Sequence, residues 1–375
     1  MLELRPFQKE ALKALESSSQ SPQHVICIAP TGSGKSLIYQ RLAAKKKRKT
    51  LLVTPLVALA RQQFHQLHEL GVPTFLGAGG GRQCPRALES GAWIVSPEML
   101  QLQSYQNLLQ QWKPDLLVVD ECHCLWEWGE DFRPAFKMIP QILHLKSIQK
   151  SLWLTATLPQ DARQQLRRLL PCEPIEIGAF DLPRGLHLDV RQVSLFDRSQ
   201  ELIRQILAQP DPGIIFVGTR ETTLRIGRLI SAIGKTVAVY HGGMSREERE
   251  NVERSIIKNK NEIIVATQAF GMGMDYSHLS YVVLWQAPTS ILSLVQTVGR
   301  VGRNSTHPGY ATVFWDSDDF RMLEWTIQNS EKRKNELQFL MTFLYSRECR
   351  RIGLRRYFDP QSHSEPCGLC DSCRA

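Results

Sequence analysis

Short apolar runs recur along the chain, and stretches with helical spacing, such as Leu56–Leu70, separate them. The runs are rich in Val, Ile and Leu and are bounded by Pro, Gly or Asp, as is typical of strands buried on both faces of a parallel sheet. Strands that alternate with helices predict a doubly wound α/β architecture. In the first half of the chain the expected strands are His24–Ala29, Leu51–Thr54, Trp93–Ser96, Leu116–Val119 and Ser151–Thr155.

A second series of strands follows a predicted linker. The segment Gly178–Gly185 has Gly at both ends and contains a Pro, which indicates a connection between domains. The alternation then resumes with the expected strands Leu186–Val190, Gly213–Val217, Thr236–Tyr240, Glu262–Ala266, Tyr281–Trp285 and Tyr310–Trp315. Strand patterns stop at Asp318, and Phe320–Ser346 consists mostly of helix formers. We therefore expect α/β domains over residues 1–180 and 181–317 and a small helical module over residues 318–375.

A phosphate-binding loop is predicted at Ala29-Pro30-Thr31-Gly32-Ser33-Gly34-Lys35-Ser36, which follows the first strand and opens a helix. Gly32 and Gly34 would let backbone N–H groups curl around phosphate oxygens, and the helix N-terminus adds a favourable dipole. Lys35 would reach the β and γ phosphates of a nucleoside triphosphate, and the Ser36 hydroxyl would ligate Mg²⁺. A glycine-rich turn without a ligand is the alternative.

Two acids, Asp120 and Glu121, follow the valines of another expected strand. Asp120 would hold Mg²⁺, directly or through water, and Glu121 would polarise the attacking water. Two acids after a strand are common in proteins. It is their occurrence together with the phosphate loop that predicts nucleotide hydrolysis.

Arg300 and Arg303 lie three positions apart in Gln296–Arg303, so we expect them to share one face of a helix. A fixed guanidinium stabilises charge that develops on a transferred phosphoryl group, and such a finger is worth about 10³–10⁵ in rate. The phosphate loop itself contains no arginine. We therefore expect both arginines to serve its nucleotide when the two domains move together, with a solvated basic face as the alternative.

Four of the nine cysteines crowd the end of the chain, at Cys349, Cys367, Cys370 and Cys373. Without an export signal, disulfides are not expected, and four thiolates suit a tetrahedral, structural Zn²⁺ site with no open position. Bound zinc supplies roughly 10–16 kcal/mol of folding free energy to a small module. His363 is an alternative ligand, although a surface histidine is the simpler interpretation.

The composition is that of an ordinary globular chain, with 42% hydrophobic and 22% charged residues among 375. It excludes a mostly disordered or fibrous protein. No apolar run approaches the length needed to cross a bilayer, and the early charges in Met1–Arg5 argue against a signal peptide, so we expect an intracellular protein. The net charge of +9 is compatible with a polyanionic partner but does not by itself indicate one.

Several short motifs, in their order along the chain, resemble those of the superfamily-two helicases, and more narrowly the RecQ DNA helicases. They are Arg5-Pro6-Phe7-Gln8, the phosphate loop, Thr54-Pro55-Leu56, Asp120-Glu121-Cys122-His123, Leu154-Thr155-Ala156-Thr157, Tyr240–Ser245, Ala266–Asp275 and the arginine motif. Trp128–Pro134 resembles the aromatic-rich loop of RecQ proteins, and the terminal cysteines also resemble that family. The resemblance implies two tandem RecA-like domains followed by a helical zinc-binding module.

The resemblance implies an ATP-dependent DNA helicase that translocates 3′ to 5′ on single-stranded DNA and separates duplex strands, in DNA repair or recombination. ATP, Mg²⁺ and Zn²⁺ would be its cofactors. Single-stranded and partly duplex DNA would be its partners, in the cytoplasm or nucleoid of a bacterium or the nucleus of a eukaryote. ATP would bind between the two domains.

The matching positions carry implied roles. Arg5 and Gln8 would hold the adenine, and Asp275 would contact the nucleotide or its neighbours. The residues implied to couple hydrolysis to domain movement are His123, Thr155 and Thr157. The residues implied to contact single-stranded DNA, by stacking on bases, are Trp128, Phe132 and Arg133. A packed loop with a buried Trp is the alternative for these three.

The sequence departs from the family's pattern in a few places. Cys122 stands where Ala is usual, Thr297 where an acid is common, and Asn304 where an Asp is common. The chain ends after the cysteines, so we expect a compact form without the winged-helix and C-terminal helical domains of longer relatives. Two other functions stay open: an RNA-dependent ATPase, and a nucleic-acid clamp that binds ATP but hydrolyses it weakly.

Overall fold

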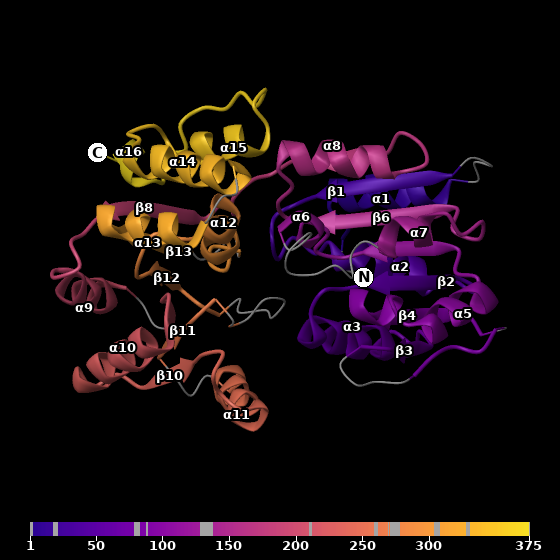
Figure 1. Ribbon diagram of the computed structural model, residues 1–375, viewed down its shortest axis with the longest axis horizontal. Coiled ribbons are helices and arrows are strands. Elements are labelled where there is room, and N and C mark those ends of the chain that lie inside the picture. Colours follow the sequence, from indigo (N-terminus) through magenta and orange to yellow (C-terminus); the bar gives the residue numbers. More distant parts are fainter. Residues whose placement is uncertain are drawn as a thin grey trace. The chain divides into compact units, whose positions relative to one another are not determined.

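The computed structural model describes residues 3–17, 22–78, 83–87, 89–127, 138–209, 212–258, 262–268, 270, 278–303, 308–327 and 331–374. The chain forms two compact units, Met1–Asp181 and Leu182–Ala375 (Figure 1). The division falls inside the linker predicted at Gly178–Gly185. Gly178 and Ala179 are exposed, as expected of a linker, but Leu182 and Pro183 are buried.

The first unit is built on a parallel sheet of seven strands in the order β3-β4-β2-β5-β6-β1-β7. The strands are β1 (Gln23–Ile28), β2 (Lys49–Val53), β3 (Thr74–Leu76), β4 (Gly91–Val95), β5 (Leu116–Val119), β6 (Lys150–Thr155) and β7 (Ile175–Gly178). The helices are α1 (Pro6–Glu16), α2 (Ser36–Ala43), α3 (Val57–Glu69), α4 (Pro97–Leu100), α5 (Gln103–Trp112), α6 (Cys124–Glu127), α7 (Ile139–Leu143) and α8 (Gln160–Leu169). Because all strands are parallel, the loops that follow β1, β2, β5 and β6 meet at one edge of the sheet.

Two apolar layers enclose this sheet. On β1, Val25 belongs to a core cluster with Leu12 of α1 and Leu42 of α2. The next residue, Ile26, belongs to the cluster on the opposite face, which includes Trp112 of α5. Successive side chains of a strand point to opposite faces, so a strand covered on both sides is apolar throughout, as the sequence predicted.

The second unit contains a six-stranded parallel sheet in the order β10-β11-β9-β12-β13-β8. The strands are β8 (Leu186–Gln192), β9 (Gly213–Phe216), β10 (Val237–Tyr240), β11 (Ile263–Ala266), β12 (Tyr281–Leu284) and β13 (Gly309–Trp315). The helices are α9 (Arg198–Ala208), α10 (Arg220–Ala232), α11 (Arg246–Ile257), α12 (Ile291–Val298), α13 (Ser317–Ile327), α14 (Glu331–Tyr345), α15 (Arg350–Phe358) and α16 (Asp371–Arg374). The predicted architecture of two doubly wound α/β domains followed by a small helical module is confirmed.

All the strands expected from the sequence are present, with bounds that differ by at most two residues. Two strands were not expected, β3 and β7. Both lie at the edges of the first sheet and are only partly buried, so they lack the continuous apolar run that marks a central strand. Among the described residues, no helix combines the length and the apolar character needed to span a membrane.

Candidate active site and metal centre

The phosphate loop connects β1 to α2, at the carboxyl edge of the first sheet. Gly32 and Gly34 have φ values of 74° and 82°, a left-handed conformation that favours glycine. Lys35 is 9% exposed. Its ammonium group donates to the carbonyl oxygens of Ala29, at 2.8 Å, and Pro30, at 3.2 Å. Two carbonyl groups of the loop therefore hold the Lys35 ammonium group.

Gln8 of α1 supports this loop from a distant part of the sequence. Its side-chain oxygen accepts from the Arg5 N–H at 2.8 Å, and its nitrogen donates to the Gly34 carbonyl at 2.7 Å. A Cβ on residue 34 would come within 2.9 Å of the Gln8 nitrogen, which is a second reason for glycine there. The structure therefore places Gln8, a predicted adenine ligand, against the phosphate loop, whereas Arg5 is exposed.

Asp120 and Glu121 follow β5, at the same edge of the sheet. One carboxylate oxygen of the buried Asp120 accepts from Gln63 of α3 at 2.6 Å, and the other accepts from the Glu121 N–H at 3.0 Å. Burial and the neighbouring Glu121 charge raise the pKa of Asp120 to about 7, while the Lys35 ammonium opposes the rise. The predicted lysine and the predicted magnesium ligand therefore interact electrostatically across the same site.

His123 links the acidic motif to the loop after β6. Its Nδ1 lies 3.0 Å from the Thr155 hydroxyl and 3.3 Å from a Glu121 carboxylate oxygen, and the Thr155 hydroxyl donates to the Thr157 carbonyl at 2.8 Å. Burial lowers the pKa of His123, but the Cys124 sulfur and the Glu121 carboxylate outweigh it, and the pKa is raised well above its usual value. His123 and the Thr155 hydroxyl therefore connect the Glu121 carboxylate to the turn at Thr157.

The arginine motif does not have the predicted geometry. The helix α12 ends at Val298, so Arg300 and Arg303 lie in the turn beyond it and do not share a helix face. Thr297 occupies the last turn of α12, where its hydroxyl donates to the Ser293 carbonyl at 2.7 Å. Arg303 Nε donates to the Gly299 carbonyl at 3.0 Å, and the Arg300 guanidinium lies 5.3 Å from the Phe216 ring centre. Glycines at 299 and 302 end the helix, a signal that the three-residue spacing of the arginines concealed.

Two buried polar side chains that interact with Asp120 were not predicted from the sequence. Gln63 is 1% exposed and orients Asp120, and it lies on the buried face of α3 with Ala60 and Leu67. A polar residue within an apolar helical stripe is the signal that would have found it. Tyr39 of α2 is fully buried, and burial together with the Asp120 charge raises the pKa of its hydroxyl.

Several predicted site residues lie outside the described part of the chain. They are the DNA-contacting candidates Trp128, Phe132 and Arg133, the nucleotide candidate Asp275, and the departure Asn304. Cys122, the departure within the acidic motif, is completely buried in the core of the first unit.

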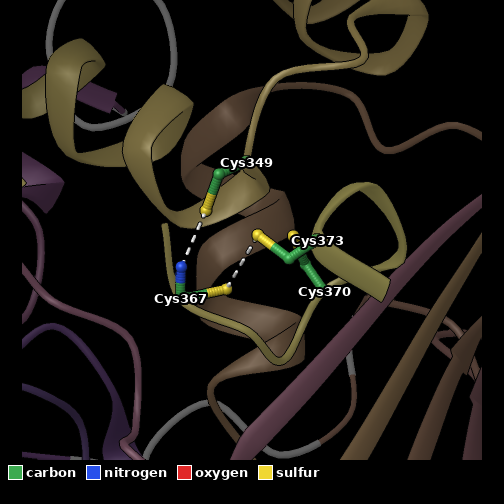
Figure 2. A group of neighbouring side chains, drawn as sticks. All are labelled: Cys349, Cys367, Cys370 and Cys373. Carbon is green, nitrogen blue, oxygen red and sulfur yellow. Dashed lines mark hydrogen bonds between the residues drawn. The ribbon is translucent and has the colours of Figure 1, made fainter. Parts of the chain in front are cut away.

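The four terminal cysteines converge on one point, as Figure 2 shows. The sulfurs of Cys349, Cys367, Cys370 and Cys373 all lie within 4.8 Å of one another, and those of Cys367 and Cys373 are 4.0 Å apart. A tetrahedral zinc with Zn–S bonds of about 2.3 Å holds its sulfurs about 3.8 Å apart, so the cluster fits this ion. The Cys367 N–H points at the Cys349 sulfur at 3.4 Å, as expected for a group that stabilises a thiolate. His363 is exposed and does not belong to the cluster.

Comparison with known proteins adds three family matches that follow one another along the chain. Residues 5–165 match the DEAD/DEAH box helicase family, residues 197–305 match the helicase conserved C-terminal domain, and residues 317–374 match the RecQ zinc-binding family. The backbone also resembles that of Dbp5 from S. cerevisiae, solved with RNA and ADP BeF3, with a TM-score of 0.67 over 90% of this chain and 93% of that one. The identity is 18%, so this likeness concerns the fold. Fold and motifs together define a superfamily-two helicase core with a zinc-binding region.

The curated relatives narrow the class. The ATP-dependent DNA helicase RecQ of Pasteurella multocida is 31% identical over 98% of this chain, and the RecQ of Haemophilus influenzae is 30% identical over 98%. The chain belongs to the RecQ family of helicases. It spans 60% and 61% of the length of these two relatives.

Proposed function

We propose that this protein is an ATP-dependent DNA helicase that moves 3′ to 5′ along single-stranded DNA and separates duplex strands, in DNA repair or recombination. The observation that carries the proposal is the convergence of Lys35, Asp120 and the Glu121–His123–Thr155 contacts at the carboxyl edge of the first sheet. Family membership supports DNA as the substrate, because the RecQ relatives are named DNA helicases. Residues 1–180, 181–317 and 318–375 would act as two motor domains and a zinc-binding module.

Binding of ATP would exchange contacts within an existing loop. Lys35 would leave the Ala29 and Pro30 carbonyls for the β and γ phosphates, and the loop N–H groups between Gly32 and Lys35 would cradle phosphate oxygens. Ser36 and Asp120 would hold Mg²⁺, which supplies charge neutralisation at the phosphates. The adenine would lie near Arg5 and Gln8.

Hydrolysis would change the contacts of the Thr155–Thr157 turn. Glu121 would orient the attacking water, and its movement would change its contact with His123, which also touches the Thr155 hydroxyl. Arg300 and Arg303 would stabilise charge on the transferred phosphoryl group, and Asp275 would contact the nucleotide or its neighbours. Trp128, Phe132 and Arg133 would contact the DNA strand.

Turnover of Lys35→Ala, measured with and without single-stranded DNA, tests the proposal. Removal of a preorganised charge typically costs about 10²–10³ in turnover, so we expect DNA-stimulated ATPase to be lost. Lys13→Ala, at an exposed lysine of α1, is the matched control and should keep wild-type turnover. Wild-type turnover in Lys35→Ala would refute the site.

Matched DNA and RNA oligomers separate the candidate substrates. A helicase of the proposed kind is stimulated by single-stranded DNA, and it unwinds a duplex with a 3′ overhang but not one with a 5′ overhang. Stimulation by RNA alone would favour an RNA-dependent ATPase, and binding without stimulation would favour a clamp. In Trp128→Ala we expect DNA stimulation to be lost while ATP binding persists.

A further inference from the structure

Five consecutive basic residues, at positions 45–49, connect α2 to β2. Three of them have partners in the protein: two bind carboxylates, and the third donates to two carbonyl oxygens. These pairs are Lys45 with Glu16 at 2.8 Å, Arg48 with Asp115 at 3.6 Å, and Lys49 with the Ala87 and Trp112 carbonyls at 2.6 and 2.9 Å. The other two, Lys46 and Lys47, are exposed and have no ion pair with any described residue. The run therefore leaves two cations available for a ligand.

These lysines border a hollow of about 360 Å³ in the first unit. Its lining combines the lysines at positions 45–47 with apolar side chains, among them Leu70, Val72 and Pro73. The volume lies within the range of roughly 300–1,000 Å³ that is typical of sites for small ligands. No aromatic ring occurs among the described residues that line it. The hollow thus offers cations and an apolar wall, but no platform for a base.

The hollow is separate from the nucleotide site. The helix α2 begins at Ser36 of the phosphate loop and ends at Ala43, which lines the hollow. This helix has eight residues and is therefore about 12 Å long. The strand β2 likewise runs from Lys49 at the amino edge of the sheet to Val53 at the carboxyl edge. A ligand in the hollow would lie at the edge of the sheet opposite the phosphate loop.

The charge around the hollow is positive. The basic residues here are those at positions 45–49, Arg86 and Lys150, and the acidic residues are Glu16, Glu69, Glu89 and Asp115. Neither Glu69 nor Glu89 lines the hollow. The ends of α2 and α3 each add about half a negative charge, which leaves a surplus of about two positive charges.

Lys150, at the start of β6, is affected by this surplus. Burial lowers the pKa of its ammonium group, and the charges of Arg48 and Lys45 lower it further, although Asp115 and Glu16 oppose the change. A further cation at this edge is therefore repelled even with both carboxylates in place. An anion would be attracted.

The backbone at Lys47 has an unusual conformation for a lysine. Its φ is 65°, in the left-handed region that favours glycine. The Arg48 N–H donates to the Lys45 carbonyl at 3.2 Å, so Lys47 lies within a closed turn. A strained position that carries an exposed cation is a candidate functional position.

We propose that this hollow is a second phosphate-binding site, which holds the sugar–phosphate backbone of the DNA strand on which the protein acts. Because no aromatic side chain is available for stacking, the contacts would be independent of base sequence. An exposed lysine binds a free phosphate ion only weakly. The phosphates of a strand already bound elsewhere on the protein reach the site at a high effective concentration, which favours a polymer over a free ion. DNA as the occupant rests on the proposed function.

The salt dependence of DNA affinity tests the site, measured by fluorescence anisotropy with labelled single-stranded DNA and the full zinc-loaded chain. Each phosphate contact on a single strand contributes about 0.7 to the slope of log K against log salt. In the double variant Lys46→Gln, Lys47→Gln the slope should become shallower by about 1.4. The affinity should fall about tenfold or more at about 0.1 M salt and converge with that of the wild type near about 1 M. Lys146→Gln, at an exposed lysine that does not line the hollow, is the control.

Lys47→Gly separates a ligand contact from a structural role. It removes the cation and relieves the left-handed backbone, so we expect the slope to become shallower by about 0.7 without a fall in thermal stability. An unchanged slope in both variants overturns the proposal. A lower affinity at an unchanged slope also overturns it, because the loss would then not come from a phosphate contact.

Replacement of chloride by inorganic phosphate at constant ionic strength distinguishes a DNA strand from a free ion. With DNA as the occupant, the difference in affinity between the wild type and the double variant should persist. Loss of this difference in phosphate would show that the free ion fills the hollow, and would overturn DNA as its occupant.

The ATPase readout keeps this inference distinguishable from the proposed function. In the double variant the DNA concentration for half-maximal stimulation should rise by the same factor as the Kd for DNA. If the slopes differ as expected but the wild type shows no DNA-stimulated ATPase, the proposed function fails and the phosphate site stands. If stimulation is present and the slopes are equal, the phosphate site alone fails.

Discussion

The phosphate loop and the cysteine cluster are both built to hold a ligand, but they differ in what holds them without one. In the loop the polar groups have partners within the protein: Lys35 binds two loop carbonyls, Gln8 binds the Gly34 carbonyl, and Asp120 binds Gln63. In the cluster the four sulfurs surround a common point and two of them are only half-buried. At the first site a ligand would exchange contacts, whereas at the second it would create them.

The difference follows from what surrounds each site. The phosphate loop rests on a sheet with apolar layers on both faces, so its geometry is set by a large core. The cysteines connect α15 and α16, helices of nine and four residues, which cannot bury enough apolar surface by themselves. Nucleotide removal and zinc removal should therefore have different consequences.

Zinc removal should produce the largest effect on stability. Cys370→Ser replaces the most buried ligand, and we expect the region from Cys349 to Arg374 to lose structure, at a cost of several kcal/mol out of the roughly 10–16 that zinc contributes to small modules. Metal analysis together with thermal unfolding measures the loss, and ATP binding to the first unit should persist. Cys172→Ser, at an exposed cysteine of the first unit, is the control. Equal unfolding curves for both variants would show that the cluster does not need its metal.

The loop side of the comparison is tested by Glu121→Gln. General base catalysis contributes about 10²–10⁴, so we expect turnover to fall within that range while ATP binding is retained. Removal of the negative charge beside Asp120 should also lower the pKa of Asp120 toward its usual value. Glu69→Gln, at an exposed glutamate that ends α3, is the control. Loss of ATP binding in Glu121→Gln would contradict a purely catalytic role.

The central strands and both candidate ligand sites were predicted from the sequence. The apolar runs located the central strands, because a strand covered on both faces must be apolar at every position. The Gly-Lys-Ser ending and the spacing of the cysteines located both ligand sites, since phosphate loops and thiolate clusters need few residues in a fixed local order.

What escaped prediction depends on contacts between distant segments. Gln8 and Gly34 are 26 positions apart, and Gln63 and Asp120 are 57 apart, so no local pattern connects them. The linker was predicted from Gly and Pro alone, but Leu182 and Pro183 are buried, and their carbonyls accept from Arg351, 168 positions after Pro183. The arginine motif was assigned to a helix by spacing, and the glycines that end α12 decided otherwise.

The pH dependence of magnesium and ATP binding tests the role of Asp120 at the phosphate loop. Burial, then the Glu121 charge, raises the pKa of Asp120 to about 7, so below this pH the carboxyl is protonated and cannot hold Mg²⁺. We expect the KM for Mg·ATP to rise about tenfold for each pH unit below about 7, measured between about pH 5.5 and 8.5. In the ligand-free protein the sign for stability is opposite. The pKa of Asp120 is higher in the folded than in the unfolded state. Between about pH 4 and about pH 7 the unfolded state therefore loses this proton more readily, and the free energy of unfolding falls as pH rises.

Gln63→Leu tests the origin of this profile. Gln63 donates to the ionised form of Asp120, so its loss should raise the pKa further and move the KM profile to higher pH. Gln62→Leu, at the neighbouring half-buried position, is the control. A profile that does not move in Gln63→Leu would place the titrating group elsewhere.

The smallest expected effect concerns Cys122, which lies outside the metal-binding cluster. Cys122 is fully buried in the first unit, and burial raises the pKa of its thiol well above the usual value, so it stays neutral and behaves as a small apolar side chain. Cys122→Ala removes one sulfur from this core, and we expect a loss of about 1 kcal/mol in the free energy of unfolding with ATPase unchanged. Chemical denaturation and steady-state turnover measure the two quantities. A fall in turnover comparable to that of Glu121→Gln would show that Cys122 shapes the active site, and the contrast between a packing cysteine and the metal-binding cysteines would no longer hold.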